Sequence, residues 1–580
     1  MDFFYKKLVK NWRLNHANAI LMAVFLIIPL EVRSDHPPVQ PLESYKNDIL
    51  NSGGVLLKEQ AAYEVEHYDI DLFVDPVDQT IHGSVIARIH IVEKLDTYVA
   101  HLDTVFLTQR VMFFPNGEQP TPMNFTHKDG LVIGEFPEAL EPGEIVDVEV
   151  TYSGKPRVAT DPPWEGGVTW SETPGGDPWI GVSCQMNGAD IWWPVKDHPS
   201  DRPESLSMKI TVPEDLVALS NGELHSIEQY SEDTRTYHWR TRHPVNNYAV
   251  TMNIGPYVTI RSDYESIAGD TFPIYFWALP ESQEQALQLM EQVVRHMQFF
   301  EGLLGPYPFR SEKYGVVEAP FLGMEHQTLV AYGAGYENDV VFESESGFDD
   351  LHHHELAHEW WGNMVAVSDW KDFWIHEGFA TYMQPLYAEE LHGNEHYQLF
   401  MRKLYERITN NMAIAPKQSR TTREMFDGRD IYMKGAWVLH TLRALIGDDP
   451  FFESLRSFLY PDEAMIAGTA RPPSRLVDTN EYIDVVKKAS GKDLDWFFDT
   501  YLRYPELPVL DKQWESDTLV LKWRTSSREP FPMPVEVYDG RANVTVTPDP
   551  EVRVQIYDRE TYEIDPQNQL LRHGLYGISE

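Results

Sequence analysis

Hydrophobic and polar residues alternate with a period of two from Tyr63 onward. The alternation is clearest over residues 63–75 (YEVEHYDIDLFVD) and 80–93 (TIHGSVIARIHIVE). Similar short runs, separated by turn residues, continue to about Tyr257, and this pattern predicts successive β-strands joined by short connections. We therefore expect an antiparallel β domain over residues 61–260.

The pattern then changes from a strand period to a helical one. Residues 272–279 (FPIYFWAL) read as a strand, and residues 281–305 read as a helix with one apolar face. That face carries Ala286, Leu289, Val293, Met297, Phe300 and Leu304. Helical segments continue to about Leu502, so we expect a helix-rich α/β domain over residues 261–505. Strands followed by helices indicate separate domains and an α+β class overall.

After this region the period returns to two. The runs TLVLKWR, PMPVEVYDG, NVTVTP and RVQIYD are short, alternating and bounded by turn residues. They predict a small C-terminal β-sandwich over residues 506–580.

The first 60 residues differ from the rest of the chain. Basic residues between Lys6 and Arg13 precede an apolar run of twelve residues at 19–30, too short for an ordinary membrane span but suited to a signal peptide. No small-residue cleavage site follows, so residues 1–34 are read as either a signal peptide or an uncleaved signal anchor. Both readings predict export, periplasmic or extracellular, with membrane contact only through this segment. Residues 35–60 are rich in proline and polar residues, which predicts a linker.

Composition narrows the range of functions. A chain of 580 residues is too long for one core and should divide into several domains. Its formal net charge of −42 argues against nucleic-acid binding and against docking on anionic lipid, both of which need a basic face. The single cysteine, Cys184, excludes an intrachain disulfide and has no evident base partner that would make it a nucleophile.

Residues 354–358 (HELAH) carry the first sign of chemistry. His354 and His358 are four positions apart, so on a helix they lie on one face and reach the same tetrahedral zinc. Glu355 lies beside the open coordination position where water binds. Glu377, nineteen residues after His358, begins a second apolar-periodic segment and could supply a third ligand. Two histidines and a glutamate plus water make a catalytic zinc set, because a structural site is closed by four protein ligands.

Other histidines occur near this motif. We read His352, His353 and His376 as non-ligands. A surface helix that carries two histidines by chance is the plain alternative to a metal site, and the correctly placed downstream glutamate favours the metal.

HELAH-x18-E followed by GFA resembles the aminopeptidase N family of zinc metallopeptidases. These gluzincins have a saddle-shaped N-terminal β domain and a thermolysin-like catalytic domain. Residues 323–326 (GMEH) resemble the family's G-x-M-E-N exopeptidase motif, with His326 in place of asparagine. The likeness runs from about His67 to about Leu510. The long helical C-terminal domain that many members carry has no counterpart in this sequence.

The resemblance implies a role for each matching residue. One Zn²⁺ per chain would be held by His354, His358 and Glu377, with Glu355 as general base. Tyr432, in a Y-x-K-G context (432–435), would stabilise the oxyanion. Glu325 would pair with the free amine of a peptide substrate. Gln185 would assist Glu325, and Gly323 and Met324 would contribute to substrate binding.

This reading predicts a zinc-dependent aminopeptidase acting on peptides with a free N-terminus. Three alternatives share the motifs: a thermolysin-like endopeptidase, a dual epoxide hydrolase and aminopeptidase, and a non-catalytic peptide-binding scaffold. An endopeptidase would leave Glu325 without a purpose. The leukotriene-hydrolase branch carries a C-terminal basic carboxylate anchor with no clear match here. A scaffold would be expected to have lost Glu355 or a metal ligand.

Overall fold

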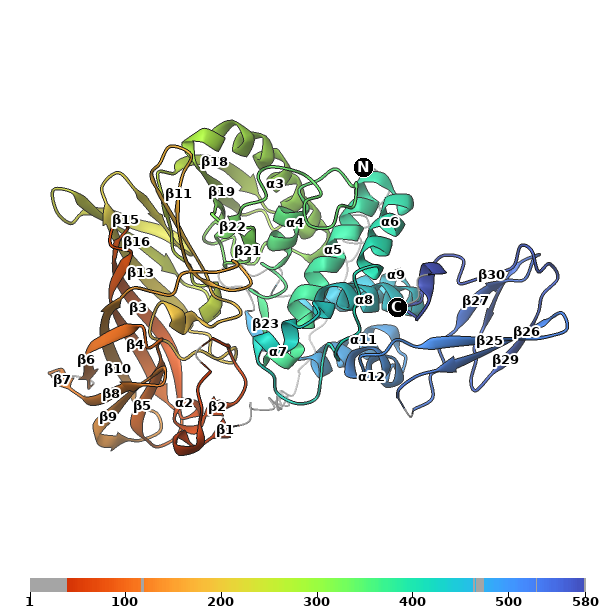
Figure 1. Cartoon of the computed structure of the whole chain (residues 1–580), viewed down its shortest axis with the longest axis horizontal. Coiled ribbons are helices and arrows are strands. Elements are labelled where there is room, and N and C mark those ends of the chain that lie inside the picture. The colour runs from red at the N-terminus through yellow and green to blue at the C-terminus, as the bar shows by residue number, and fades with distance from the viewer. Residues whose placement is uncertain are drawn as a thin grey trace, which may run out of the picture.

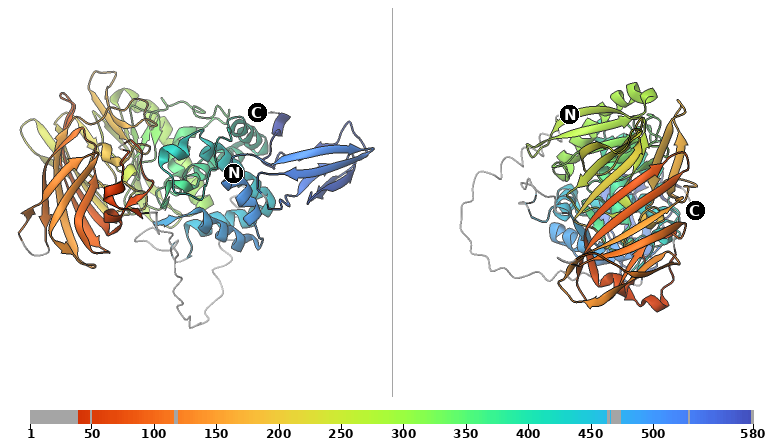
Figure 2. Two further views of the ribbon diagram at one scale, coloured as in Figure 1. Left: turned by 60° about the horizontal axis from the view of Figure 1, so that its bottom comes forward. Right: turned by 90° about the vertical axis from the view of Figure 1, so that its left-hand side faces the viewer.

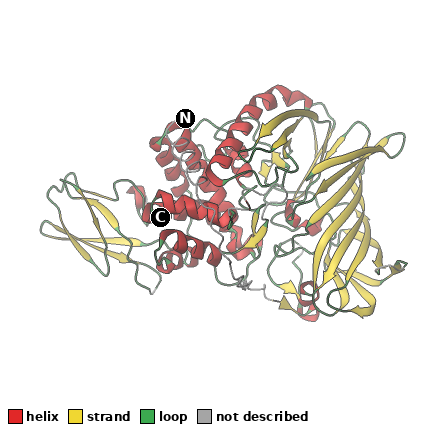
Figure 3. Ribbon diagram, turned by 180° about the vertical axis from the view of Figure 1, so that it is seen from behind, coloured by secondary structure: helices red, strands yellow, loops and turns green. Residues whose placement is uncertain are grey.

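The computed structural model describes residues 39–48, 50–115, 119–462, 465, 474–527 and 529–577. Within those residues no helix is long and apolar enough to cross a membrane. The segment 1–34, expected to be a signal peptide or anchor, lies outside them. Three parts follow one another across the molecule: a strand-rich part, a helix-rich part and a second, smaller strand-rich part (Figures 1 and 3).

The N-terminal domain is built on an eight-stranded sheet with the order β15-β16-β13-β3-β4-β10-β6-β7. Strand β3 (Tyr63–Asp75) pairs with β4 (Thr80–Ile91) along nearly its whole length, and its alternate residues are buried, as the pattern predicts. A three-stranded sheet, β5-β9-β8, and a four-stranded sheet, β11-β12-β17-β14, complete the domain. The other strands are β5 (Leu95–His101), β6 (Phe106–Phe114), β7 (Thr121–Pro122), β8 (Asn124–Lys128), β9 (Leu131–Leu140), β10 (Ile145–Gly154), β11 (Gly167–Glu172), β12 (Pro178–Ser183), β13 (Ser205–Pro213), β14 (Val217–Leu219), β15 (Glu223–Gln229), β16 (Thr234–Thr241) and β17 (Asn253–Gly255).

One pairing differs from the expected antiparallel arrangement. Strand β13 runs parallel to β3, with Ser205 opposite His67. Strand β12, which precedes β13 in the chain, belongs to the four-stranded sheet, so the chain leaves the large sheet and returns to it beside the start of β3. A parallel pair requires such a crossover connection, and alternation within a strand does not reveal one.

The described part of the predicted linker is not a free tether. It contains β1 (Val39–Gln40), β2 (Leu56–Leu57) and the start of α2 (Lys58–Ala61). Leu57 is fully buried, and Ser52 accepts a hydrogen bond of 3.1 Å at its carbonyl from the Thr422 backbone N–H of the helix-rich domain. Gly53 has a φ of +82°, and a Cβ there would lie 2.2 Å from the Trp370 ring. The linker prediction is therefore wrong for these residues, because leucine and glycine allow the segment to pack against both domains.

The helix-rich domain combines a five-stranded sheet with helices. Its sheet order is β18-β19-β20-β22-β21, and the short edge strand β21 (Gly323–Met324) runs antiparallel to β22 (Val330–Tyr332). The other strands are β18 (Val258–Glu265), β19 (Thr271–Ala278), β20 (Tyr314–Glu318) and the separate parallel pair β23 (Val365–Val367) and β24 (Arg475–Val477). The helices are α3 (Gln283–Leu304), α4 (Asp350–Ala357), α5 (Trp374–His392), α6 (Asn394–Tyr405), α7 (Thr422–Phe426), α8 (Asp430–Ile446), α9 (Asp448–Leu459), α11 (Thr479–Ser490) and α12 (Asp495–Arg503). The predicted apolar face of α3 is buried.

The C-terminal part consists of two three-stranded sheets, β25-β26-β29 and β28-β27-β30. Its strands are β25 (Val509–Glu515), β26 (Thr518–Arg524), β27 (Val535–Tyr538), β28 (Asn543–Val546), β29 (Val552–Gln555) and β30 (Glu563–Ile564). Leu519 and Leu521 from one sheet and Val535 and Val537 from the other are fully buried, as a β-sandwich requires. The sandwich lies across the helices from the N-terminal domain (Figure 2).

Candidate functional site

The two histidines of the HELAH motif lie one turn apart at the end of α4. The Asp349 side chain caps the start of this helix by accepting a 2.8 Å hydrogen bond from the His352 backbone N–H. The Nε2 atoms of His354 and His358 are 3.1 Å apart. Nδ1 of His358 donates to the Trp361 carbonyl at 2.8 Å, so its Nε2 carries the lone pair that a metal needs. The predicted shared face is confirmed.

Glu377 comes to these nitrogens from α5. Its Oε2 lies 3.4 Å from Nε2 of His354 and 3.4 Å from Nε2 of His358. This oxygen is buried and makes no hydrogen bond within the described residues. A tetrahedral zinc with ligands at about 2.0–2.1 Å separates its ligand atoms by roughly 3.3 Å. A buried, unpaired carboxylate oxygen facing two imidazole nitrogens at this spacing fits one Zn²⁺ ion.

Glu355 lies on the same helix and faces the edge strand β21. A Cβ added at Gly323 would lie 2.6 Å from Oε1 of Glu355, so any side chain at this position would displace the carboxylate. Burial raises the pKa of Glu355 well above its ordinary value, and the Glu325 carboxylate adds to the shift. Gly323 therefore acts by leaving space for Glu355.

Glu325 follows β21 directly and forms a buried pair with Gln185. Nε2 of Gln185 donates to Oε1 of Glu325, although the two residues are 140 positions apart and belong to different domains. A carboxylate oxygen of Glu325, a carboxylate oxygen of Glu355 and a ring nitrogen of His358 all lie within 4.8 Å of one another. Burial raises the pKa of Glu325 to about 7, and the His358 imidazole opposes this shift. Met324 is buried in β21, where its backbone pairs with Ala331.

Tyr432 reaches the site from the first turn of α8. Its ring stacks on His354 with centroids 6.1 Å apart. Helices α5 and α8 touch at Gly378 and Gly435, where a Cβ on Gly435 would lie 2.8 Å from the Gly378 Cα. Glu377 precedes Gly378, and Tyr432 lies one turn before Gly435. This close crossing therefore brings Tyr432 and Glu377 together. Burial, followed by the carboxylate of Glu377, raises the pKa of Tyr432 well above its ordinary value.

The neighbouring histidines have structural partners instead of metal contacts. His376 accepts at Nε2 from the Val367 backbone N–H at 3.0 Å, and Nε2 of His352 lies 2.9 Å from the Tyr314 hydroxyl. His353 stacks on Tyr387 with centroids 4.8 Å apart. None of the three belongs to either group of possible metal ligands found within the described residues.

Tyr248 is a residue of this site that the sequence analysis missed. It is buried, and its pKa is raised by burial and then by the carboxylates of Glu325 and Glu377. Its carbonyl accepts a 3.4 Å hydrogen bond from the thiol of Cys184, and burial raises the pKa of this thiol, as expected of a packed cysteine that is not a nucleophile. One tyrosine among 29 carries no motif of its own, so only the fold reveals its position.

Comparisons with known proteins place the chain in a family. Residues 64–249 match the Peptidase M1 N-terminal domain, and residues 289–501 match the Peptidase family M1 domain, together more than half of the chain. Aminopeptidase N of Lactococcus lactis is 23% identical over 57% of this chain and 39% of its own length. Leucine aminopeptidase 2 of Sclerotinia sclerotiorum is 21% identical over 89% of this chain and 87% of its own length.

The fold has a counterpart among solved structures. An M1 zinc metallopeptidase variant from Deinococcus radiodurans, bound to a Tyr-Ser-Ala substrate, is 25% identical, with a TM-score of 0.62. The alignment covers 79% of this chain and 98% of that one. Matches to aminopeptidase N and endoplasmic reticulum aminopeptidase 1 relatives cover only 30–39% of those proteins.

Proposed function

The chain belongs to peptidase family M1, and we propose that it is a zinc-dependent aminopeptidase, which removes N-terminal residues from peptides. The observation that carries this proposal is the buried Glu325 carboxylate, within 4.8 Å of ligating atoms of Glu355 and His358. In a peptide, the α-amine and the first carbonyl carbon are separated by only two bonds. A carboxylate this close to the reacting groups can therefore pair with the α-ammonium of the residue whose carbonyl is attacked, which is the first residue of the peptide.

Each residue of the site then has a chemical task. Zinc, when bound, supplies a Lewis acid that polarises the substrate carbonyl and lowers the pKa of water. Glu355 accepts a proton from the attacking water and passes it to the leaving amine. The Tyr432 hydroxyl donates a hydrogen bond to the oxyanion. The backbone of β21, at the edge of its sheet, pairs with the extended peptide and holds it in line.

Glu325 and Gln185 recognise the substrate's charged end. An ammonium in this buried setting needs a carboxylate, since an unpaired charge there is costly. The names of the relatives support this assignment, since they are aminopeptidases. The tripeptide bound by the Deinococcus enzyme is a substrate of the same class.

The alternative functions differ in whether they require Glu325 and Glu355. A thermolysin-like endopeptidase has no use for a buried carboxylate paired with Gln185 beside the metal ligands. A binding scaffold has no use for Glu355 in the space that Gly323 leaves. A dual epoxide hydrolase would retain both groups, and a leukotriene A-4 hydrolase homolog from Botryotinia fuckeliana is 21% identical over 89% of this chain. Activity toward an epoxide substrate therefore has to be measured separately.

The proposal is tested with paired peptides that differ only in N-acetylation. Free-amine peptides should be shortened from the N-terminus, the acetylated forms should resist, and phenanthroline should abolish the reaction. If acetylated peptides were cleaved at internal bonds as fast as free peptides, the aminopeptidase proposal would fail and the endopeptidase alternative would be favoured. Failure to hydrolyse any peptide, with zinc bound, would favour the scaffold.

We also propose that the protein is exported. The support is the basic and then apolar pattern of residues 1–34. Fractionation of cells that express the chain with and without residues 1–34 tests this proposal. The full chain should leave the cytoplasm and the shortened chain should remain there; equal distribution of both would refute export. Mass spectrometry of the exported chain would distinguish cleavage from anchoring.

A further inference from the structure

The segment 325–328, which carries the amine-recognising Glu325, is held by other elements at four of its backbone groups. The Glu325 carbonyl accepts from Asn363 at 2.9 Å, and the Gln327 carbonyl accepts from Asn221 of the N-terminal domain at 2.7 Å. At Thr328 the backbone N–H donates to Glu359 at 2.8 Å, and the carbonyl accepts from Nζ of Lys313 at 2.9 Å. The position of Glu325 therefore depends on contacts that do not touch a substrate.

Thr328 has a backbone conformation that its residue type disfavours. Its φ is +61°, in the left-handed region that β-branched residues rarely occupy. Its hydroxyl accepts from the Gly222 backbone N–H at 2.8 Å and lies 3.3 Å from Nζ of Lys313. A strained conformation persists only where its surroundings impose it. Here the surroundings are a turn of the N-terminal domain and a buried lysine.

Lys313 contacts both the N-terminal domain and the helix-rich domain at this point. It is buried, and its Nζ contacts the carbonyl and hydroxyl of Thr328 as well as the Ser220 carbonyl at 3.4 Å. Nζ also lies over the rings of Trp239, at 5.3 Å, and Trp277, at 5.8 Å. These contacts hold Nζ in place, so it serves as a fixed donor to Thr328.

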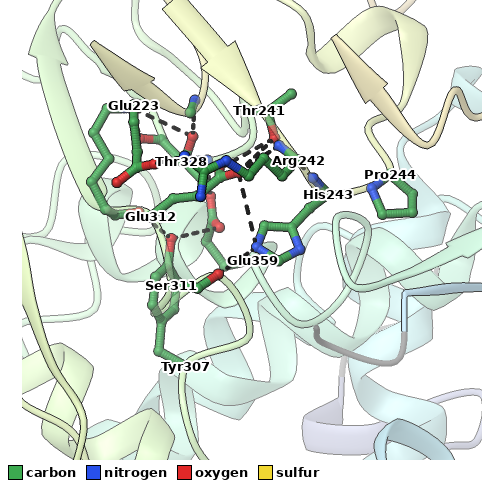
Figure 4. Close-up of polar contacts among 12 residues, drawn as sticks. Glu223, Thr241, Arg242, His243, Pro244, Tyr307, Ser311, Glu312, Thr328 and Glu359 are labelled. Carbon is green, nitrogen blue, oxygen red and sulfur yellow. Dashed lines mark hydrogen bonds and ion pairs between the residues drawn. The ribbon is translucent and has the colours of Figure 1, made fainter. Parts of the chain in front are cut away.

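Glu359 connects the same point to the metal centre. It follows the predicted ligand His358 in the chain, and it accepts from the Thr328 N–H at one oxygen and from the Tyr307 hydroxyl at the other. Figure 4 shows Thr328, Glu359 and Tyr307 in this arrangement. Thr328 is thus held between the metal-ligand segment, Lys313 and the turn at 220–222.

We propose that Lys313 and Thr328 are positioning residues for recognition of the substrate amine. They set the distance between Glu325 and the metal ligands, and they align Glu325 with Gln185 of the other domain. This inference rests on the proposed aminopeptidase function and adds the device that gives the exopeptidase its selectivity. Neither residue takes part in bond breaking, so their loss should affect substrate recognition more than turnover.

A nearby contact across the same domain interface provides a control. Nε2 of His243 lies 2.7 Å from the Ser311 hydroxyl, and Glu312 accepts from the Arg242 backbone N–H at 2.7 Å (Figure 4). Neither contact includes the segment 325–328. Ser311→Ala therefore weakens the interface without releasing Thr328, and it separates a general effect on domain packing from an effect on Glu325.

The experiment compares Lys313→Met, Thr328→Gly, Thr328→Ser and Ser311→Ala with the wild-type holoenzyme. Thr328→Gly accepts the left-handed backbone but loses the hydroxyl contacts, whereas Thr328→Ser keeps a hydroxyl. We measure zinc content, kcat and KM on a free-amine peptide, and the rate ratio between that peptide and its N-acetylated form. Lys313→Met and Thr328→Gly should raise KM about tenfold and reduce the ratio, with kcat within about twofold. Thr328→Ser and Ser311→Ala should keep the wild-type ratio, and all four variants should retain zinc.

Two results would overturn the inference in distinguishable ways. If wild type shows no preference for the free amine, the proposed function fails and this inference fails with it. If wild type has the preference and Thr328→Gly, folded and zinc-loaded, keeps it with an unchanged KM, the inference fails alone. A loss of selectivity in Ser311→Ala equal to that in Lys313→Met would also overturn it. Thr328→Gly decides the question if Lys313→Met does not fold.

Discussion

The proposed metal ligands and the proposed amine-recognition pair are neighbours, but they are built differently. His354, His358 and Glu377 all come from two helices of the catalytic domain. Gln185 and Glu325 are 140 residues apart and meet across a domain interface. The proposed metal ligands thus lie within one domain, whereas the proposed recognition pair depends on how two domains pack together. Changes to the first group should affect metal binding or kcat, and changes to the second should affect selectivity.

The largest effect is expected at the metal ligands. Glu377→Ala removes the buried oxygen that faces both histidines, so the protein should lose zinc and all peptidase activity. Metal analysis of the purified variant and of His354→Ala measures this loss. Gln185→Ala serves as a control that should retain about one zinc per chain, and full zinc occupancy in Glu377→Ala would contradict the ligand assignment.

Glu355→Gln should separate chemistry from metal binding. The amide fits the space beside Gly323 but is not a base, so kcat should fall by roughly 10²–10⁴ while zinc stays bound. Steady-state kinetics together with metal analysis measures both. A kcat close to wild type would remove Glu355 from the role of general base.

Tyr432→Phe tests the remaining group of the reacting site. The ring still stacks on His354 but loses its hydroxyl, so kcat should fall by about 10²–10³ with little change in KM. The ratio between free and N-acetylated peptides should stay at the wild-type value, because recognition is unaffected. Normal turnover would show that another group stabilises the oxyanion.

Glu325→Ala should give the opposite pattern. With the carboxylate gone, kcat/KM for free-amine peptides should fall by about two to three orders of magnitude, and the preference over N-acetylated peptides should narrow. Gln185→Ala should act in the same direction more weakly, since a neutral amide contributes less than a carboxylate. Unchanged selectivity in Glu325→Ala would show that the amine is read elsewhere.

The smallest effect is expected at the helix crossing behind the metal centre. Gly435→Ala places a methyl group 2.8 Å from the Gly378 Cα, so α5 and α8 must separate. Overpacking of this kind typically costs about 1–3 kcal/mol, and the shift of Tyr432 should lower kcat by less than about tenfold. Thermal unfolding and kinetics measure the two effects, and Gly378→Ala should act alike because it meets the same backbone. A variant with wild-type Tm and kcat would show that the crossing tolerates a methyl group.

Much of the fold and of the candidate site follows from short-range spacing. Alternation predicts β3 and β4, and the apolar face predicts α3, because burial selects one face of each element. The parallel pairing of β13 with β3 and the docking of residues 50–57 are not predictable in this way. Both depend on which distant segments of the chain pack together, and the hydrophobic period within one element carries no information about that packing.

That His354 and His358 share a face follows from local spacing alone, because four residues make about one helical turn whatever surrounds them. Spacing also indicated Glu377 as a candidate third ligand, and the motif resemblance added Glu325, Gln185 and Tyr432, in each case without placing the residue. How these groups meet depends on contacts between distant segments of the chain. Tyr432 approaches Glu377 because two glycines let α5 and α8 touch, and Glu325 meets Gln185 across the domain interface, three residues before the Thr328 that Lys313 and Glu359 contact. Such contacts join residues far apart in the chain, so their energy is gained only when the domains pack together.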